Sequence, residues 1–387
     1  MHAPPAGAAG PGAAFGRRER VATRLAFFIA GLTVSAWAPL IPYAKRRLVL
    51  DDAQLGLMLL CLGIGSVLLM PVAGGLAARF GCRRALVAAG VVVCAALPCL
   101  VLSASVPALA ATLLVIGASI GVFDVVMNIQ AVAVERDGGR AMMSGFHGMY
   151  SVGGIAGAGG VAGLVALGAS PLAAVSGVAI VAAGLLAASV RGLLPDGGEA
   201  DHPAFALPRG RVLLIGAVCF AMFLAEGAVL DWSAVFLSTV RGADLAAAGF
   251  GYVAFAATMT AGRLAGDRIV QALGRLRVVV AGALLAACGF ALAVLAPSWW
   301  AGLAGFALVG AGAANVVPVM FSAAGRQRRM PAHLAVAAVT TMGYAGVLLG
   351  PAALGFVAKA ASLSVALGGL ALLLAGVAAV ARTVTRD

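Results

Sequence analysis

The residues of this sequence that could carry out chemistry are a few polar and ionisable side chains set inside long apolar runs. Asp124 and Asn128 lie four positions apart within one such run. This spacing places them on the same face of a helix, where together they could hydrogen-bond a hydroxylated or a cationic solute. The alternative is a polar clamp between helices that binds no ligand. Both residues are therefore candidate substrate contacts.

Two further acids, Glu226 and Asp231, share a second apolar run. Their side chains should point about 140° apart around a helix, so we do not expect a carboxylate pair. Glu226 lies deeper in the run and is the better candidate for a proton carrier, because burial favours the protonated form of a carboxyl group. Asp231 is a second proton-coupling candidate. Its alternative is an acid at a helix end near basic residues such as Arg46.

The other polar candidates lie in separate runs. His147 could relay protons because histidine titrates near neutral pH, and Tyr150 shares its helix face as a possible substrate contact. A hydrogen bond from His147 to a neighbouring helix fits the sequence equally well. Asn315 follows Asp124 at an offset of 191 residues and is either a substrate contact or a packing residue. Trp37 could form the floor of a substrate cavity or anchor a helix at an interface.

Composition determines which elements must position these side chains. Hydrophobic residues make up 63% of the 387 residues, charged residues make up 10%, and the mean hydropathy is +1.07. Soluble domains are nearer half apolar and a quarter charged, so this chain could not cover a water-facing surface. The net charge of +12 does not indicate nucleic-acid binding, because the arginines occupy short gaps between apolar runs. These values predict an all-α polytopic membrane protein.

Apolar runs long enough to cross a bilayer, about 20 residues each, occur twelve times. The predicted spans are 21–43, 53–77, 84–104, 107–134, 141–167, 171–190, 211–236, 245–265, 276–296, 299–323, 332–358 and 362–381. Of the 26 lysines and arginines, 21 fall in or beside the two tails and the connections that follow the even-numbered spans. Because cytoplasmic segments carry the excess of basic residues, this distribution predicts that both termini are cytoplasmic.

A polar stretch at 191–210 divides the spans into two sets of six. We interpret it as a cytoplasmic linker between a six-helix bundle at 21–190 and a second bundle at 211–382. The segment 1–20 is expected to be a disordered cytoplasmic tail, and 383–387 a short second tail. Two such halves are the layout of a transporter whose substrate site lies at the interface of the repeats, near the membrane midplane.

The clearest sign of an internal repeat is a glycine-and-basic motif after spans 2 and 8. The first copy contains Gly74, Arg79, Gly81, Arg83 and Arg84, and the second contains Gly262, Arg263, Asp267, Arg268, Gly274 and Arg275. From about residue 20 to 385 the chain resembles the major facilitator superfamily, whose motif reads Gly-x3-Asp-Arg-x-Gly-x-Arg-Arg. The acidic position is Ala78 in the first copy, whereas Asp267 keeps an acid in the second.

The resemblance implies gating roles for residues of these motifs and of the connection before span 5, namely Arg79, Arg83, Arg140, Asp267 and Arg268. Because only the second copy keeps its acid, we expect an asymmetric gate. Asp267 should meet either the start of span 5, between Arg140 and Gly145, or the basic cluster at 326–329.

Three shorter motifs resemble the YbjJ/MosC-like bacterial branch of the superfamily. They are Asp124 to Asn128, Gly145 to Gly148, and Glu226 to Trp232. The resemblance implies the twelve-helix superfamily fold, in two pseudo-symmetric halves of six helices, in the bacterial inner membrane. It also implies a secondary transporter that moves a small solute by alternating access, coupled to protons and acting as a monomer. The branch does not identify the substrate.

Two alternatives stay open on the sequence alone. One is a drug or metabolite efflux pump of the same fold, and the other is a transporter-like sensor or scaffold that moves nothing. The intramembrane acids Asp124 and Glu226 count against the scaffold, which would have no need of them. No motif for nucleotide phosphates, a dinucleotide or a nucleophilic serine is present, so we expect no enzyme activity and no cofactor. The cysteine spacing predicts neither a metal site nor a disulfide framework.

Overall fold

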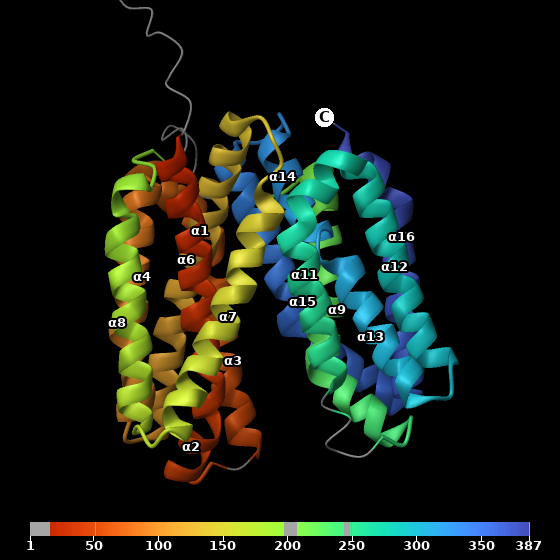
Figure 1. The fold of residues 1–387 in the computed structure, drawn as a ribbon, viewed down its shortest axis with the longest axis horizontal. Coiled ribbons are helices and arrows are strands. Elements are labelled where there is room, and N and C mark those ends of the chain that lie inside the picture. The colour runs from red at the N-terminus through yellow and green to blue at the C-terminus, as the bar shows by residue number, and fades with distance from the viewer. Residues whose placement is uncertain (1–15, 51, 197–206, 244–247, 249, 387) are drawn as a thin grey trace, which may run out of the picture.

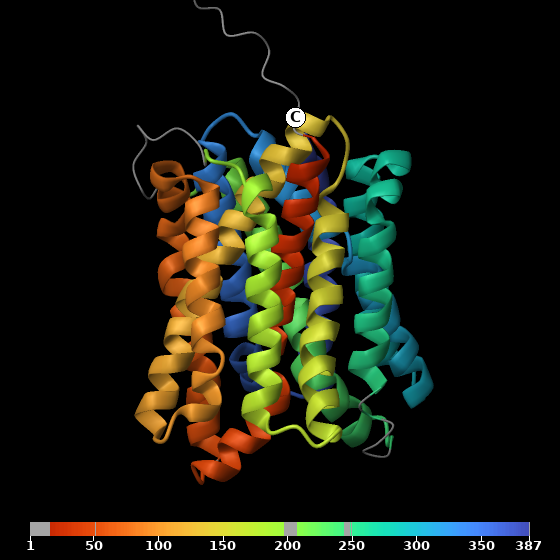
Figure 2. The ribbon, with the colours of Figure 1, turned by 60° about the vertical axis from the view of Figure 1, so that its left-hand side comes forward.

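In the computed structural model, helices run back and forth between two faces of the molecule (Figure 1). The structure describes residues 16–50, 52–196, 207–243, 248 and 250–386. The helix that begins the chain starts on the same face as the last helix ends, and we call this the terminal face (Figures 1 and 2). Residues 1–15 of the predicted tail 1–20 and residues 197–206 of the predicted linker 191–210 lie outside the described residues.

The chain forms two halves. The first contains α1 (Arg17–Ser35), the 3-10 turn η1 (Ala38–Leu40), α2 (Ile41–Arg47), α3 (Asp52–Phe80), α4 (Cys82–Ala96), α5 (Cys99–Leu102), α6 (Val106–Gly138), α7 (Met143–Ala166), α8 (Pro171–Ser189) and η2 (Val190–Gly192). The second contains α9 (Arg211–Thr239), α11 (Phe250–Leu273), α12 (Arg275–Leu295), α13 (Trp299–Ala313), α14 (Val316–Arg326), α15 (Ala332–Ala360) and α16 (Leu363–Thr385). Helices satisfy their own backbone hydrogen bonds, as a lipid environment requires.

Within the described residues, eleven segments are long and apolar enough to cross a membrane. A twelfth helix, α11, has 24 residues but is less hydropathic because it carries Arg263, Asp267 and Arg268. A helix can hold such residues at membrane depth when protein groups rather than lipid surround them. The predicted all-α fold of membrane-spanning helices is confirmed.

Several predicted boundaries differ from the helices. α1 begins at Arg17, inside the segment expected to be a disordered tail. α11 continues to Leu273, eight residues past the predicted end of its span at 265, so the prediction of a connection there is wrong. Asp267 and Arg268 therefore lie on a helix, where each side chain has a defined direction.

Two spans are interrupted. The first breaks after Ser35, and Trp37 lies in the break before η1. The tenth breaks between Ala313 and Val316, so Asn315 lies at the junction of α13 and α14. Such breaks expose backbone groups, which in a membrane protein are tolerated where other protein groups or a water-filled cavity satisfy them.

The internal repeat is visible in the backbone itself. Gly81 precedes α4 with φ 83° and ψ 153°, and Gly274 precedes α12 with φ 79° and ψ 155°. Side chains with a Cβ rarely adopt such positive φ values, which explains glycine at both turns. A Cβ on Gly81 would in addition collide with the carbonyl oxygen of Pro195.

Close crossings of helices within the first half depend on glycine. A Cβ on Gly117 of α6 would strike the carbonyl oxygen of Leu62 on α3, and one on Gly31 of α1 would strike that of Tyr150 on α7. Small residues allow membrane helices to approach until their backbones touch, and this use accounts for part of the 53 glycines.

The halves meet mainly along two helix pairs, α3 with α15 and α7 with α11, and α6 also contacts α14 and α15 while α7 contacts α14. At Gly74 of α3, an added Cβ would lie 2.8 Å from the carbonyl oxygen of His333 on α15. At Gly148 of α7, it would lie 2.9 Å from the side chain of Leu264 on α11. In Figure 1 the ribbons of α7 and α11 approach each other near the terminal face and diverge toward the opposite face.

Candidate functional site

Asp124 connects the two halves near the middle of α6. It is 7% exposed, and its carboxyl group accepts a hydrogen bond from the hydroxyl of Tyr344 on α15. One turn further, Asn128 donates its side-chain amide to the carbonyl oxygen of Asp124 at 2.9 Å. The amide oxygen of Asn128 is buried and has no hydrogen-bond partner among the described residues. The predicted pair thus presents two acceptors on one helix face. One is the carboxylate of Asp124, which also binds Tyr344, and the other is the amide oxygen of Asn128.

A second polar group centres on Arg263 of α11, which is 6% exposed. Its Nη2 lies 3.5 Å from Oε2 of Glu226 on α9, within the second half. Its Nη1 donates to the hydroxyl of Ser151 on α7, in the first half, at 3.1 Å. One guanidinium group therefore binds the predicted proton carrier and crosses to the other half of the molecule.

The two groups lie in the same region of the interface. Tyr150 on α7 interacts electrostatically with Asp124, Glu226 and Arg263. Tyr344 likewise interacts with Asp124, Tyr150 and Glu226. The structure thus brings together Asp124, Asn128, Tyr150 and Glu226, four of the residues that the sequence singled out.

Arg263 corrects part of the sequence analysis. It was counted with the basic residues of a connection, but it lies inside α11 and is buried against Glu226. One signal was available: Arg263 stands four residues before Asp267, so both lie on one face of α11. Tyr344 was also missed, although it is one of only 4 tyrosines in the chain and lies within the predicted span 332–358.

His147 is enclosed by aromatic rings. Its ring centroid lies 5.1 Å from that of Phe27 on α1 and 5.5 Å from that of Phe321 on α14. Its Nε2 has no hydrogen-bond partner among the described residues. The residue is thus part of a packed aromatic contact between the halves, and a proton-relay role stays a prediction.

Three other candidates are placed apart from these polar groups. Asn315 donates to the carbonyl oxygen of Gly262 at 3.1 Å, a contact within the second half that corresponds to its packing alternative. Trp37 is buried beside the break after α1, with an indole nitrogen that has no hydrogen-bond partner among the described residues. Asp231 is exposed, further along α9 than Glu226. None of their proposed roles is tested by these positions.

Asp267 joins the halves at the terminal face. Its Oδ1 accepts a hydrogen bond from the N–H of Gly145 at 3.0 Å, and the carboxylate also bonds the N–H of Ser144. The N–H groups of a helix's first turn lack partners within the helix and form its positive end, so a carboxylate there is stabilising. The contact is the first of the two alternatives expected from the sequence, the start of span 5 rather than the basic cluster at 326–329, while the gating role of Asp267 stays a prediction.

Glu135, which the sequence analysis did not single out, adds a second connection at this face. It is 7% exposed at the end of α6, and its Oε2 accepts from the N–H groups of Met142 at 2.9 Å and Met143 at 2.8 Å. Its Oε1 lies 3.5 Å from Nη1 of Arg326 at the end of α14. The start of α7 is thus held by a carboxylate from each half.

The four arginines expected in the gate do not bridge the halves. Arg83 donates its Nε to the carbonyl oxygen of Leu193, at the start of the linker, at 2.9 Å. Arg79 lies over the ring of Phe80 at 5.3 Å, and Arg140 and Arg268 are exposed. None of them makes a hydrogen bond or an ion pair with the opposite half in the described part of the chain.

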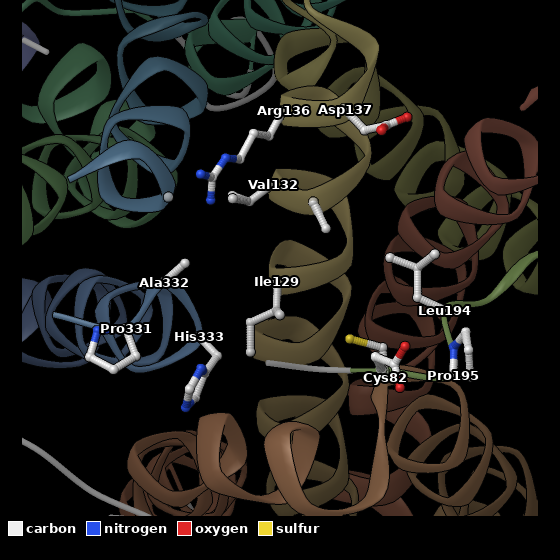
Figure 3. A pocket seen from close by; sticks show the side chains of 13 residues that line it. Cys82, Ile129, Val132, Arg136, Asp137, Leu194, Pro195, Pro331, Ala332 and His333 are labelled. Carbon is white, nitrogen blue, oxygen red and sulfur yellow. The ribbon is translucent and has the colours of Figure 1, made fainter. Parts of the chain in front are cut away.

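A cavity of about 880 Å³ opens between the halves at the terminal face. Figure 3 shows Val132 and Arg136 of α6 on one side and Ala332 and His333 of α15 on the other, with Cys82 further along the wall. Its lining does not include the central polar residues around Asp124 and Arg263. The cavity is therefore separate from the candidate substrate site.

Comparison with known proteins identifies the family. The model of the Major Facilitator Superfamily matches residues 24–327. An uncharacterized MFS-type transporter of Yersinia pestis is 57% identical over 372 residues, covering 96% of this chain and 97% of the relative. The membrane protein MosC of Rhizobium meliloti is 34% identical over 346 residues, covering 88% of this chain and 84% of the relative.

Solved structures show the same fold at low identity. FucP in its outward conformation has a TM-score of 0.82 at 16% identity, covering 97% of this chain and all of that one. The proton:xylose symporter XylE has a TM-score of 0.72 at 12% identity, covering 95% of each chain. The chain therefore belongs to the major facilitator superfamily, and it is a multi-pass membrane transporter, not an enzyme.

Proposed function

We propose that this protein moves a small polyhydroxylated solute across the bacterial inner membrane by alternating access, and that proton binding to Glu226 drives the cycle. The observation that carries the proposal is the double contact of Arg263, which binds Glu226 in its own half and Ser151 in the other. A residue with these two contacts links the protonation of one half to the relative position of both.

The coupling follows from the charge on Glu226. When its carboxylate is ionised, it attracts Arg263 and holds part of the guanidinium's hydrogen-bonding capacity. A proton on Glu226 removes that attraction and leaves a buried arginine that must find other acceptors, such as Ser151 or a bound solute. The free energy of protonating Glu226 thus differs between the two arrangements of the halves. Protonation can therefore shift the equilibrium between these arrangements.

The substrate class follows from the groups around Asp124. A carboxylate, the spare amide oxygen of Asn128 and the hydroxyls of Tyr150 and Tyr344 offer several acceptors together with donors. Sugar-like and polyol solutes present hydroxyl groups that both donate and accept. FucP is a fucose:proton symporter and XylE is a proton:xylose symporter, which supports the same substrate class for this chain.

The proposal takes the terminal face as cytoplasmic, because the two tails and even-numbered connections carry most of the basic residues. A reporter fused after Arg329 should then be cytoplasmic, and one fused within 297–299 should be periplasmic. The reverse pair of signals would contradict this orientation.

Transport into proteoliposomes with an imposed pH gradient, screened against polyols, sugars and cationic drugs, tests the function. Wild-type protein should accumulate a polyhydroxylated solute only when the gradient is present. Glu226→Gln should abolish gradient-driven accumulation but keep exchange of solute without a gradient. Asp231→Asn is the comparison for a carboxyl group on the same helix and should keep accumulation.

Each other outcome has a defined meaning. Normal accumulation by Glu226→Gln would remove Glu226 as the proton carrier, and loss in Asp231→Asn alone would transfer the role to Asp231. Accumulation of cationic drugs alone would favour the efflux alternative. The absence of any transport by well-folded protein would favour a sensor or scaffold.

A further inference from the structure

A second concave surface at the terminal face is lined mainly by arginines. The cavity has a volume of about 690 Å³ and lies where the start of α9, the end of α16 and the loop between α14 and α15 meet. Five of its lining residues are arginines, namely Arg211, Arg326, Arg328, Arg329 and Arg386. No acidic residue lines it among those that the structure describes.

The general excess of basic residues on this face does not account for the cavity. That excess concerns the number of charges in the connections and requires no clustering. Here guanidinium groups from three separate parts of the chain converge on one hollow, where like charges repel. Arg211 donates to the carbonyl oxygen of Val384 at 3.1 Å, and Arg326 pairs with Glu135 at 3.5 Å. Arg328, Arg329 and Arg386 remain exposed at the cavity.

The loop that carries two of these arginines is held in a defined conformation by Gln327. The side-chain oxygen of this residue, which is 8% exposed, accepts from the N–H groups of Arg329 at 2.9 Å and Met330 at 3.0 Å. Its side-chain nitrogen donates to the carbonyl oxygen of Met330. Gly210 leaves room beside the loop, since a Cβ there would lie 3.1 Å from Nη1 of Arg329. A site that is ordered before binding loses little entropy when its ligand arrives.

We propose that this cavity, which we name the arginine cavity, binds the phosphate group of an anionic ligand. Guanidinium groups match phosphate oxygens in charge and in the geometry of paired hydrogen bonds. The cavity lies at the ends of membrane-spanning helices, where the headgroups of a bilayer are found, so an anionic phospholipid is the favoured source of the phosphate. A soluble phosphate compound is the other source that this chemistry allows.

The test uses full-length protein, purified and delipidated in a neutral detergent, with binding measured by native mass spectrometry. The probes are phosphatidylglycerol, zwitterionic phosphatidylcholine and inorganic phosphate. The pocket variant is Arg328→Gln/Arg329→Gln. Its matched control is Arg84→Gln/Arg277→Gln, which removes two exposed arginines outside the cavity. At about 1 kcal/mol per arginine near a membrane surface, the pocket variant should bind phosphatidylglycerol about 30-fold more weakly.

The outcomes distinguish a lipid source of the phosphate, a soluble source of the phosphate, and no phosphate binding in the arginine cavity. Phosphatidylglycerol binding that is lost in the pocket variant, kept in the control and absent with phosphatidylcholine supports the proposal with lipid as the source. The same dependence for inorganic phosphate alone supports it with a soluble source. Equal binding by the pocket variant and the control, or no binding of either anion by wild-type protein, overturns it.

A single variant covers the case in which the double variant does not fold. Arg386 is exposed at the end of the described chain, so Arg386→Gln should leave the fold intact. It should weaken binding of the same anion about fivefold, on the basis of about 1 kcal/mol for one arginine. Unchanged affinity in Arg386→Gln would count against the arginine cavity as the binding site.

Discussion

Glu135 and Arg326 are separated by 191 residues along the chain, and their side chains form an ion pair at 3.5 Å. Glu135 lies near the end of α6 in the first half, and Arg326 is the last residue of α14 in the second half. The ion pair therefore joins the two halves at the terminal face.

Glu135 and Arg326 should contribute unequally to stability. Glu135→Gln removes the charge behind three contacts, namely the ion pair and the two N–H contacts at the start of α7, whereas Arg326→Gln removes only the first of these three. Hydrogen bonds to charged groups contribute about 1.5–3 kcal/mol each, so Glu135→Gln should lower the thermal unfolding temperature more. Tryptophan fluorescence of the detergent-solubilised protein measures this. An equal or larger effect of Arg326→Gln would show that Glu135 acts mainly through the ion pair.

The sequence predicted those features that depend on local composition. Apolar runs located the helices, and positive-φ glycines at 81 and 274 produced a repeat that could be recognised before the fold was known. Asp267 was expected to meet either the start of span 5 or the basic cluster at 326–329, and its carboxylate bonds the N–H of Gly145 at the start of α7. That expectation succeeded because the motif placed an acid at one end of the molecule, where a helix start offers unpaired N–H groups.

Pairings across the interface could not be predicted from one chain read in order. Arg263 looked like a residue of a connection because hydropathy falls wherever an arginine stands, whether it faces water or a buried carboxylate. Tyr344 and Glu135 gave no local signal of their partners, which lie on other helices. Asn315 had the correct offset from Asp124, but its amide bonds Gly262 within its own half, because the break in its span turns it toward α11.

Solute binding should depend on Asp124 and, more weakly, on Tyr344. Asp124→Asn removes the charge but keeps an acceptor for the Tyr344 hydroxyl, so the helices should stay packed while solute binding is lost. Tyr344→Phe removes one hydrogen-bonding group, at a cost of about 1 kcal/mol, and should weaken binding roughly fivefold. Equilibrium binding of the solute found in the transport screen measures both. Glu226→Gln serves as the comparison and should keep binding, and normal binding by Asp124→Asn would remove Asp124 from the substrate site.

Two glycines with different surroundings should respond differently to the same substitution. Gly117→Ala would drive a methyl group into the carbonyl oxygen of Leu62 and force α3 and α6 apart. Gly184→Ala is the matched control, since a Cβ on Gly184 of α8 meets nothing within 4 Å. Overpacking typically costs about 1–3 kcal/mol, so Gly117→Ala should lower the thermal unfolding temperature and Gly184→Ala should not. Equal melting of the two variants would contradict the close crossing of α3 and α6.

Asp267 should hold the terminal face closed. Its carboxylate on α11 binds the first turn of α7, so each opening of that face must break a charge-assisted hydrogen bond between the halves. Asp267→Asn removes the charge and weakens the contact with the positive end of α7. At about 1.5 kcal/mol lost, the lower end of the range for hydrogen bonds to charged groups, the ratio of open to closed protein should rise about tenfold.

Thiol labelling of Ser144→Cys, in a variant without the native cysteines, reports this opening. Ser144 is 2% exposed on α7, and a Cβ on Gly266 of α11 would lie 2.5 Å from the Cβ of Ser144, so the residue is covered while the halves touch. Labelling should be slow in this background and about tenfold faster when Asp267→Asn is added, in proportion to the open fraction. Glu19→Gln, which neutralises an acid on α1 at the same face, is the control and should leave the rate unchanged. If Asp267→Asn labels no faster than the control, Asp267 does not hold this face closed, and the Glu135–Arg326 pair becomes the contact to test.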